Sequence, residues 1–181
     1  DLFDRFEQTP NQQQVGATSS RNQDPPRHLI QSAIDLYNQG QFQQTLDRIK
    51  QLFEEFPKSA VLCNLQGAGH AGLGDLDGAI NSFRHAIKIK PDFADAYNNL
   101  GAALRQKGGL DEAISCYKQA ITIKPNFSDA HYNNGNALTQ KGALDEAISS
   151  YRQAIKIKPD YAEAYNNMGF ALQEKGALDE A

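Results

Sequence analysis

The chain has 181 residues, of which 40% are hydrophobic and 22% charged, and its formal net charge is −4. This balance is typical of a soluble globular protein, and it lacks the excess of positive charge that attracts nucleic acid or an acidic membrane surface. No stretch approaches the roughly 20 consecutive apolar residues of a membrane-spanning helix, so we expect neither a nucleic-acid nor a membrane partner.

The first 25 residues differ from the rest of the chain. Residues 8–25 are rich in Gln, Asn, Ser and Asp, a composition that cannot bury a core, and we expect a mostly flexible leader over residues 1–25. Residues 1–8 form a short apolar motif, in which Leu2, Phe3 and Phe6 can share one face of a helical turn. Eight residues do not hold a helix alone in water, so this motif would need a surface to dock on.

From residue 26 onward the sequence repeats every 34 residues. Repeats 94–127 and 128–161 are identical at 22 of 34 aligned positions. A repeat of this length is typical of stacked supersecondary units. The predicted repeats are 26–59, 60–93, 94–127, 128–161 and a truncated 162–181.

Each repeat is predicted to form two antiparallel helices. In 94–127, an apolar stripe at helical spacing includes Tyr97 and Leu104. Gly108 can take the left-handed conformation that ends a helix, and Pro125 stops the second helix because proline lacks the N–H group. The expected helices are 27–39, 42–55, 60–73, 76–89, 94–107, 110–123, 128–141, 144–157 and 162–175.

At these positions the chain resembles the tetratricopeptide repeat family. The family pattern combines Leu-Gly, alanines, an aromatic residue and proline at fixed offsets, and repeat 94–127 supplies Leu100-Gly101, Ala113, Tyr117, Ala120 and Pro125. The resemblance covers residues 26–181. It implies an all-α, right-handed superhelical solenoid of antiparallel helix pairs, whose first helices line a concave groove.

One pair of residues has side chains that are suited to catalysis or metal binding. Cys63 and His70 lie seven residues apart on one helix face, without a second ligand pair, and both occupy positions that normally fill the core. We interpret them as core residues and expect no catalytic site, metal or cofactor. Two cysteines without a CxxC motif do not form a disulfide framework, which fits a cytoplasmic location.

A series of asparagines points to binding. Asn99, Asn133 and Asn167 occupy one position in three successive first helices, although asparagine is a poor helix former. The series resembles the asparagine ladder in the repeat domain of O-linked N-acetylglucosamine transferases, which implies groove-lining amides that hold an extended peptide. We therefore expect these amides to be free of intrachain bonds. The alternatives are inheritance by repeat duplication and bracing of adjacent helices. The full set of expected groove residues is Asn64, Asn98, Asn99, Arg105, Gln106, Asn133, Asn136, Gln140, Asn166, Asn167 and Gln173.

The last repeat stops at Ala181, just inside its second helix. A solenoid ordinarily ends in a capping unit with a polar outer face, so a longer parent protein is expected. An unpaired first helix would expose apolar surface, and such surface tends to find a partner. The residues expected to self-associate are Tyr165, Met168 and Leu172 of this helix, together with Leu2, Phe3 and Phe6 of the leader.

These observations favour a scaffold that binds a protein or an extended peptide, and not an enzyme. Two alternatives stay open. In the first, the chain is the substrate-recognition arm of a larger glycosyltransferase or sulfotransferase, and catalysis takes place outside these residues. In the second, it is a self-assembling repeat scaffold that forms homo-oligomers.

Overall fold

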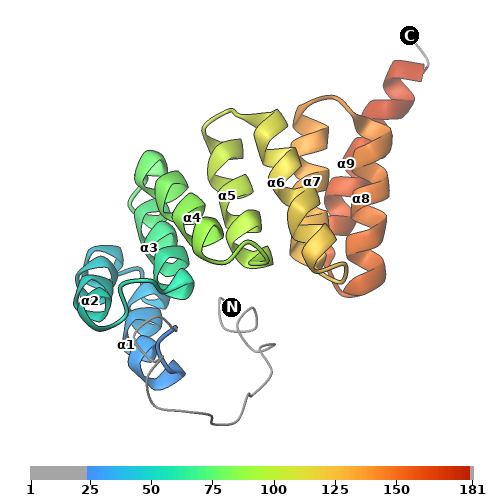
Figure 1. Cartoon of the computed structure of the whole chain (residues 1–181). Helices are drawn as coiled ribbons and strands as arrows, with labels where there is room; N and C mark the ends of the chain where they lie inside the picture. Colours follow the sequence, from blue (N-terminus) through green and yellow to red (C-terminus); the bar gives the residue numbers. More distant parts are fainter. Residues whose placement is uncertain (1–23, 180–181) are drawn as a thin grey trace. The chain divides into compact units, whose positions relative to one another are not determined.

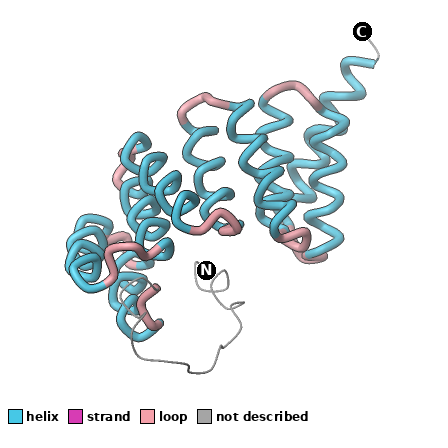
Figure 2. The backbone as a smooth tube through the Cα atoms, viewed as in Figure 1, coloured by secondary structure: helices cyan, strands magenta, loops and turns pink. Residues whose placement is uncertain are grey.

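The computed structural model describes the backbone of residues 24–179 and the side chains of residues 24–176. This part of the chain is helical and contains no strand (Figures 1 and 2). The helices are α1 (Arg27–Asn38), α2 (Phe42–Glu55), α3 (Ala60–Gly72), α4 (Leu76–Ile89), α5 (Ala94–Gln106), α6 (Leu110–Ile123), α7 (Ser128–Gln140), α8 (Leu144–Ile157) and α9 (Ala162–Asp179). The expected all-α architecture is confirmed, and every helix begins at the residue that the repeat predicted.

The helices fall into two compact units, which divide between Pro91 and Asp92. Helices α1 to α4 form the first unit, and α5 to α9 form the second. Inside each unit, consecutive helices pack against one another, both within a repeat and from one repeat to the next. The first unit has a core of aliphatic side chains contributed by α1, α2 and α3, among them Ile34, Ile49 and Leu62.

The turn between the two helices of a repeat depends on glycine. The four turn glycines have positive φ angles: 75° at Gly40, 79° at Gly74, 89° at Gly108 and 80° at Gly142. This left-handed conformation is open to glycine at little cost and is a common way to end a helix. The predicted helix breaks at these residues are therefore confirmed.

Packing within a repeat depends on a second glycine, in the middle of the first helix. A Cβ at Gly135 would lie 2.6 Å from Cε1 of Tyr151, and Tyr151 is only 1% exposed. The absence of a side chain at Gly135 therefore lets the ring lie against the helix backbone. The same arrangement joins Gly67 to Phe83 and Gly101 to Tyr117.

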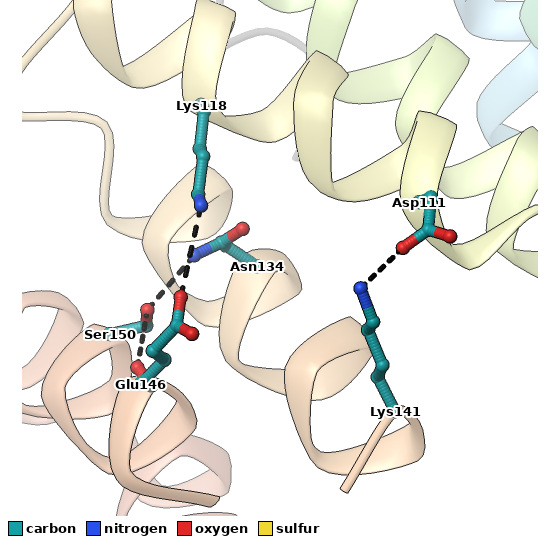
Figure 3. Close-up of polar contacts among 6 residues, drawn as sticks. All are labelled: Asp111, Lys118, Asn134, Lys141, Glu146 and Ser150. Carbon is teal, nitrogen blue, oxygen red and sulfur yellow. Dashed lines mark hydrogen bonds and ion pairs between the residues drawn. The ribbon is translucent and has the colours of Figure 1, made fainter. Parts of the chain in front are cut away.

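Polar contacts also connect the helices of the second unit, both between neighbouring repeats and within one repeat (Figure 3). The Lys141 ammonium lies 2.5 Å from Oδ1 of Asp111. Asn134 Nδ2 donates to Ser150 Oγ at 2.9 Å, and that hydroxyl donates to the Glu146 carbonyl. These contacts connect α6, α7 and α8.

The last helix differs from the prediction, because α9 continues to Asp179 instead of ending at residue 175. Gly176 corresponds to the turn glycines of the earlier repeats, but it does not have a positive φ angle. In those repeats the second helix packs back onto the first and stabilises the turn. Within the described residues, α9 runs through Gly176 without a break.

Candidate functional site

The second unit places its first helices side by side. Helix α7 contacts α5 on one side and α9 on the other. Because the sequence repeats every 34 residues, equivalent positions return to the same face of each of these helices. Side chains at equivalent positions of α5, α7 and α9 therefore form a continuous strip.

A pocket of about 290 Å³ lies on this strip. Four of its lining residues belong to the predicted groove set: Arg105, Asn136, Gln140 and Asn167. Three others were not predicted: Thr139, Tyr151 and Phe170. Tyr151 was missed because its position marks it as a core aromatic residue, whereas Phe170 occupies the same repeat position as Asn136 and was identifiable from that register.

A hydrogen-bond network fixes the side chains around the pocket. The Tyr151 hydroxyl donates to Asn136 Oδ1 at 2.8 Å. Asn167 Nδ2 donates to the same oxygen at 2.8 Å and to the Tyr132 hydroxyl at 3.1 Å. The side-chain oxygen of Asn136 thus accepts two hydrogen bonds, which fix the orientation of the side chain. Its amide nitrogen is the polar group that remains. Among the described residues, no acceptor is bonded to that nitrogen.

The prediction that the repeated asparagines have free amides is wrong. Asn133 Nδ2 donates to Asn98 Oδ1 at 2.9 Å, Asn167 makes the bonds given above, and Asn99 also has a partner within the chain. The reason is the close packing of successive first helices, which brings asparagines of adjacent repeats within reach of one another. These bonds correspond to the alternative in which the asparagines brace neighbouring helices.

Two further members of the predicted set are not accessible. Asn98 is 1% exposed and Asn64, in the first unit, is 2% exposed, so neither offers its side chain to a ligand in this structure. Gln106, Asn166 and Gln173 are exposed on α5 and α9 but do not line the pocket.

Arg105 determines the electrostatics of the pocket. Its Nε is buried and has no hydrogen-bond partner among the described residues. Burial raises the pKa of the neighbouring Tyr117 hydroxyl to about 12, and the charge of Arg105 acts in the opposite direction. Burial also raises the pKa of Tyr151, again against an opposing effect of Arg105. The guanidinium is thus close to two neutral phenols.

Exposed apolar side chains gather on α9. Tyr165 is 47% exposed and Leu172 is 44% exposed, as expected, whereas Met168 is half-buried. Phe170, which was not predicted, is 54% exposed. Leu2, Phe3 and Phe6 lie outside the described residues.

Cys63 and His70 do not form a reactive pair. Cys63 is 3% exposed, in agreement with its interpretation as a core residue. His70 is different, because its Nδ1 lies 2.8 Å from Asp75 Oδ2 and its side chain stays 26% exposed. Asp75 also caps α4 by accepting from the Gly78 N–H group at 2.9 Å, so His70 contributes to a helix terminus and not to the core.

Neither a metal cluster nor a membrane span is visible in the described part of the chain. Within it, no group of three or more His, Cys, Asp or Glu side chains is arranged to hold a metal ion. Its helices are also too short or too polar to cross a membrane.

The helix pairs, the turn glycines and the glycine–aromatic contacts define a tetratricopeptide repeat fold. The TPR repeat family model matches residues 72–108, 102–138 and 135–176. The chain therefore belongs to the TPR repeat family.

Individual relatives agree on the fold. A crystal structure of MamA is 27% identical with a TM-score of 0.72, and the match covers 82% of this chain and 86% of that one. The first TPR of Spaghetti (RPAP3), bound to the HSP90 peptide SRMEEVD, is 20% identical with a TM-score of 0.64, over 65% of this chain and 93% of that one. Mouse protein arginine N-methyltransferase 9 is 35% identical over 71 residues, which are 39% of this chain and 8% of the enzyme's length.

Proposed function

We propose that the second unit is a recognition module that binds an extended peptide segment of a partner protein along α5, α7 and α9. The observation that carries this proposal is the pocket between these helices. Its polar side chains are held in place by mutual hydrogen bonds, while the Asn136 amide nitrogen stays available as a donor and Arg105 supplies a positive charge.

In this proposal the asparagines have two roles. Asn133 and Asn167 connect neighbouring helices and arrange the pocket, whereas Asn136 donates to the peptide. A prearranged network lowers the entropy that is lost on binding, because fewer side chains must be ordered by the ligand. Each peptide hydrogen bond would contribute about 0.5–1.5 kcal/mol.

The solved relatives support the proposal at the level of the fold. The RPAP3 domain was solved with an HSP90 peptide bound, and a structure of yeast Sti1 is a complex of its TPR2B domain with pHsp70. The same architecture therefore accommodates protein ligands elsewhere, although these domains are only 20% and 24% identical to this chain. The alternative of a glycosyltransferase or sulfotransferase arm gains no support from these relatives.

Selection from a random heptapeptide library, displayed on phage and presented to the full chain, tests the proposal. We expect enriched peptides whose affinity, measured by calorimetry, falls about tenfold in the Gln140→Ala/Phe170→Ala variant, because two exposed contacts are lost. The matched control is Leu73→Ala/Gln119→Ala, which removes the same kinds of exposed side chain away from the pocket. The absence of enriched peptides, or equal losses in both variants, would refute the proposal.

A second candidate function is self-association through α9, favoured by the exposure of Tyr165 and Leu172. Burying these side chains against a second copy of the chain would remove apolar surface from water. Light scattering at increasing concentration tests this: we expect a dimer in the natural chain and a monomer in the Tyr165→Ser/Leu172→Ser variant. A natural chain that stays monomeric at all concentrations would contradict it.

A further inference from the structure

A second groove in the second unit lies between the C-terminal turns of α6 and α8, beside the first turn of α7. This α6–α8 groove has a volume of about 540 Å³ and shares no lining residue with the pocket on α5, α7 and α9. We infer that it is a separate docking site, which takes a short segment of a partner protein with one bulky apolar side chain next to an acidic one. Either site can exist without the other, so the chain would connect two ligands.

The apolar part of the α6–α8 groove suits one bulky side chain. Ile121 of α6 and Ile157 of α8 both line it and are half-buried, and Pro125 lies exposed in the turn between α6 and α7. A leucine or phenylalanine side chain placed here would remove its own surface and that of the two isoleucines from water. An apolar anchor within a polar rim is a common arrangement at protein interfaces.

The polar rim of the groove is not engaged elsewhere in the protein. The side chains of Asn126, Gln153 and Lys156 are exposed, and none of them makes a hydrogen bond or ion pair with another described residue. His131 is oriented by the chain, because its Nε2 donates to the Pro125 carbonyl at 3.0 Å. The rim therefore offers two amides and an ammonium group to a ligand.

The charge of the groove favours an acidic segment. Lys156 lines the groove, and no Asp or Glu does. Asp129 belongs to the same turn of α7 as His131, but it accepts a hydrogen bond from the Tyr161 hydroxyl at 3.1 Å and is not a lining residue. A carboxylate next to the apolar anchor would meet Lys156 without repulsion from the groove itself, whereas a basic segment would be repelled.

Two lining residues differ from their equivalents in the repeats on either side. Asn126 replaces an aspartate, and His131 replaces a tyrosine. The equivalent residues are Asp92, Tyr97, Asp160 and Tyr165. The first change removes a negative charge from the rim, and the second replaces a phenol by a smaller ring. Both changes make this groove more suitable for an acidic segment with a bulky side chain.

The probes are fluorescein-labelled hexapeptide pools with an amidated carboxyl terminus. The third position is fixed as Phe, Leu or Ser, and the fourth as Glu, Gln or Lys. Binding to the full chain is measured by fluorescence anisotropy. We expect the Phe and Leu pools to bind about tenfold more tightly than the Ser pools, because an apolar anchor is buried. Among them, the Glu pools should bind about two- to fivefold more tightly than the Gln pools, as expected for an exposed ion pair, and the Lys pools should bind most weakly.

Two variants connect these preferences to the groove. His131→Tyr restores the tyrosine of the neighbouring repeats and should abolish the advantage of Phe and Leu, because the larger ring fills the groove. Lys156→Glu should reverse the order, so that the Lys pools bind more tightly than the Glu pools. The fold tolerates glutamate at this position, since Glu54 is the equivalent residue of α2. The matched control is Lys88→Glu, at the equivalent exposed position of α4 outside the groove, and it should change nothing.

Three results would overturn the inference. The first is equal binding of the Phe, Leu and Ser pools. The second is an unchanged preference for Glu in a Lys156→Glu variant that circular dichroism shows to be folded. The third is a loss of pool binding in Gln140→Ala/Phe170→Ala, which would place the peptides in the pocket on α5, α7 and α9 instead.

Other occupants of the groove give their own signals. If the pools bind only to the Leu2→Ser/Phe3→Ser/Phe6→Ser variant, the leader fills the groove. If light scattering shows that His131→Tyr converts a dimer to a monomer, a second copy of the chain fills it. Either result contradicts docking of a partner protein. Pool binding to the natural chain, with the expected order and its reversal in Lys156→Glu, supports it.

Discussion

Gly135 and Gly169 occupy the same repeat position, but only Gly135 is covered by an aromatic ring. A Cβ at Gly135 would lie 2.6 Å from the Tyr151 ring, whereas nothing lies within 4 Å of a Cβ at Gly169. We expect Gly135→Ala to lower the free energy of unfolding by about 1–3 kcal/mol, since the buried ring must move. Gly169→Ala should instead raise it by up to about 1 kcal/mol through helix propensity. Urea denaturation of both variants measures the difference, and equal effects would refute this packing explanation.

The hydrogen bond between Asn133 and Asn98 gives a second prediction. Asn98 is 1% exposed, and its Oδ1 accepts from Asn133 Nδ2. Asn133→Ala leaves this buried oxygen without its donor, which should cost about 1–3 kcal/mol of stability. Asn166→Ala removes an exposed amide in the neighbouring repeat and should change stability by less than about 0.5 kcal/mol. A neutral Asn133→Ala variant would show that the bond does not brace the helices.

The two cysteines should differ in reactivity. Burial, assisted by the negative charge of Asp24, raises the pKa of the Cys63 thiol to about 11, whereas Cys116 is half-buried. At pH 8 only about one Cys63 thiol in a thousand would be ionised, and the thiolate is the reactive form. We expect iodoacetamide to modify Cys116 first and Cys63 only after unfolding, as measured by mass spectrometry of the peptides. Equal rates in the folded protein would contradict this burial.

At the scale of the helices, the packing of α6 against α5 should make stability depend on pH. Burial raises the folded-state pKa of Tyr117 from 10.0 to about 12. A group with a raised pKa stabilises the fold fully below its unfolded pKa, and this contribution is lost between about pH 10 and pH 12. Tyr117→Phe should therefore lose less stability than the natural chain between pH 8 and pH 11. Denaturant titrations at both pH values measure the free energy of unfolding of the two proteins. If the variant and the natural chain lose the same amount of stability, the prediction is wrong.

The helix boundaries were largely predictable because they depend on local signals. Gly40, Gly74, Gly108 and Gly142 end first helices by their own backbone freedom, and a proline follows each complete second helix. The end of α9 was not predicted by the same signal, because Gly176 lies within α9 and lacks a positive φ angle. Periodicity also placed Arg105, Asn136 and Asn167 on one face, which is a property of helical geometry.

The hydrogen-bond partners could not be predicted in the same way. Asn167 bonds Asn136 and Tyr132 across two helices, over separations of 31 and 35 residues. Which of several nearby polar groups becomes the partner depends on helix packing at the scale of tenths of an ångström. Tyr151 is a second example. The repeat pattern predicts that its ring lies in the core, but it does not predict that its hydroxyl reaches the pocket.

At the scale of the molecule, the proposed ligand recognition belongs to the second unit. The pocket and its hydrogen-bond network use residues of α5, α7, α8 and α9 only. The first unit contributes a separate aliphatic core and a helix cap at Asp75. Peptide binding should therefore tolerate exposed substitutions in the first unit, such as Leu73→Ala, that leave its fold intact.

The most direct measurement is nuclear magnetic resonance of the isotope-labelled full chain during titration with the tightest peptide from the selection. If the pocket binds the peptide, the side-chain resonances of Arg105, Asn136 and Gln140 should shift together, with a single affinity that matches calorimetry. The resonances of Lys118 on α6, whose ammonium lies 3.8 Å from Oε2 of Glu146 on α8 (Figure 3), should stay unchanged. Shifts confined to the first unit or to Lys118 and its surroundings, with an unaffected pocket, would contradict peptide recognition at the pocket on α5, α7 and α9.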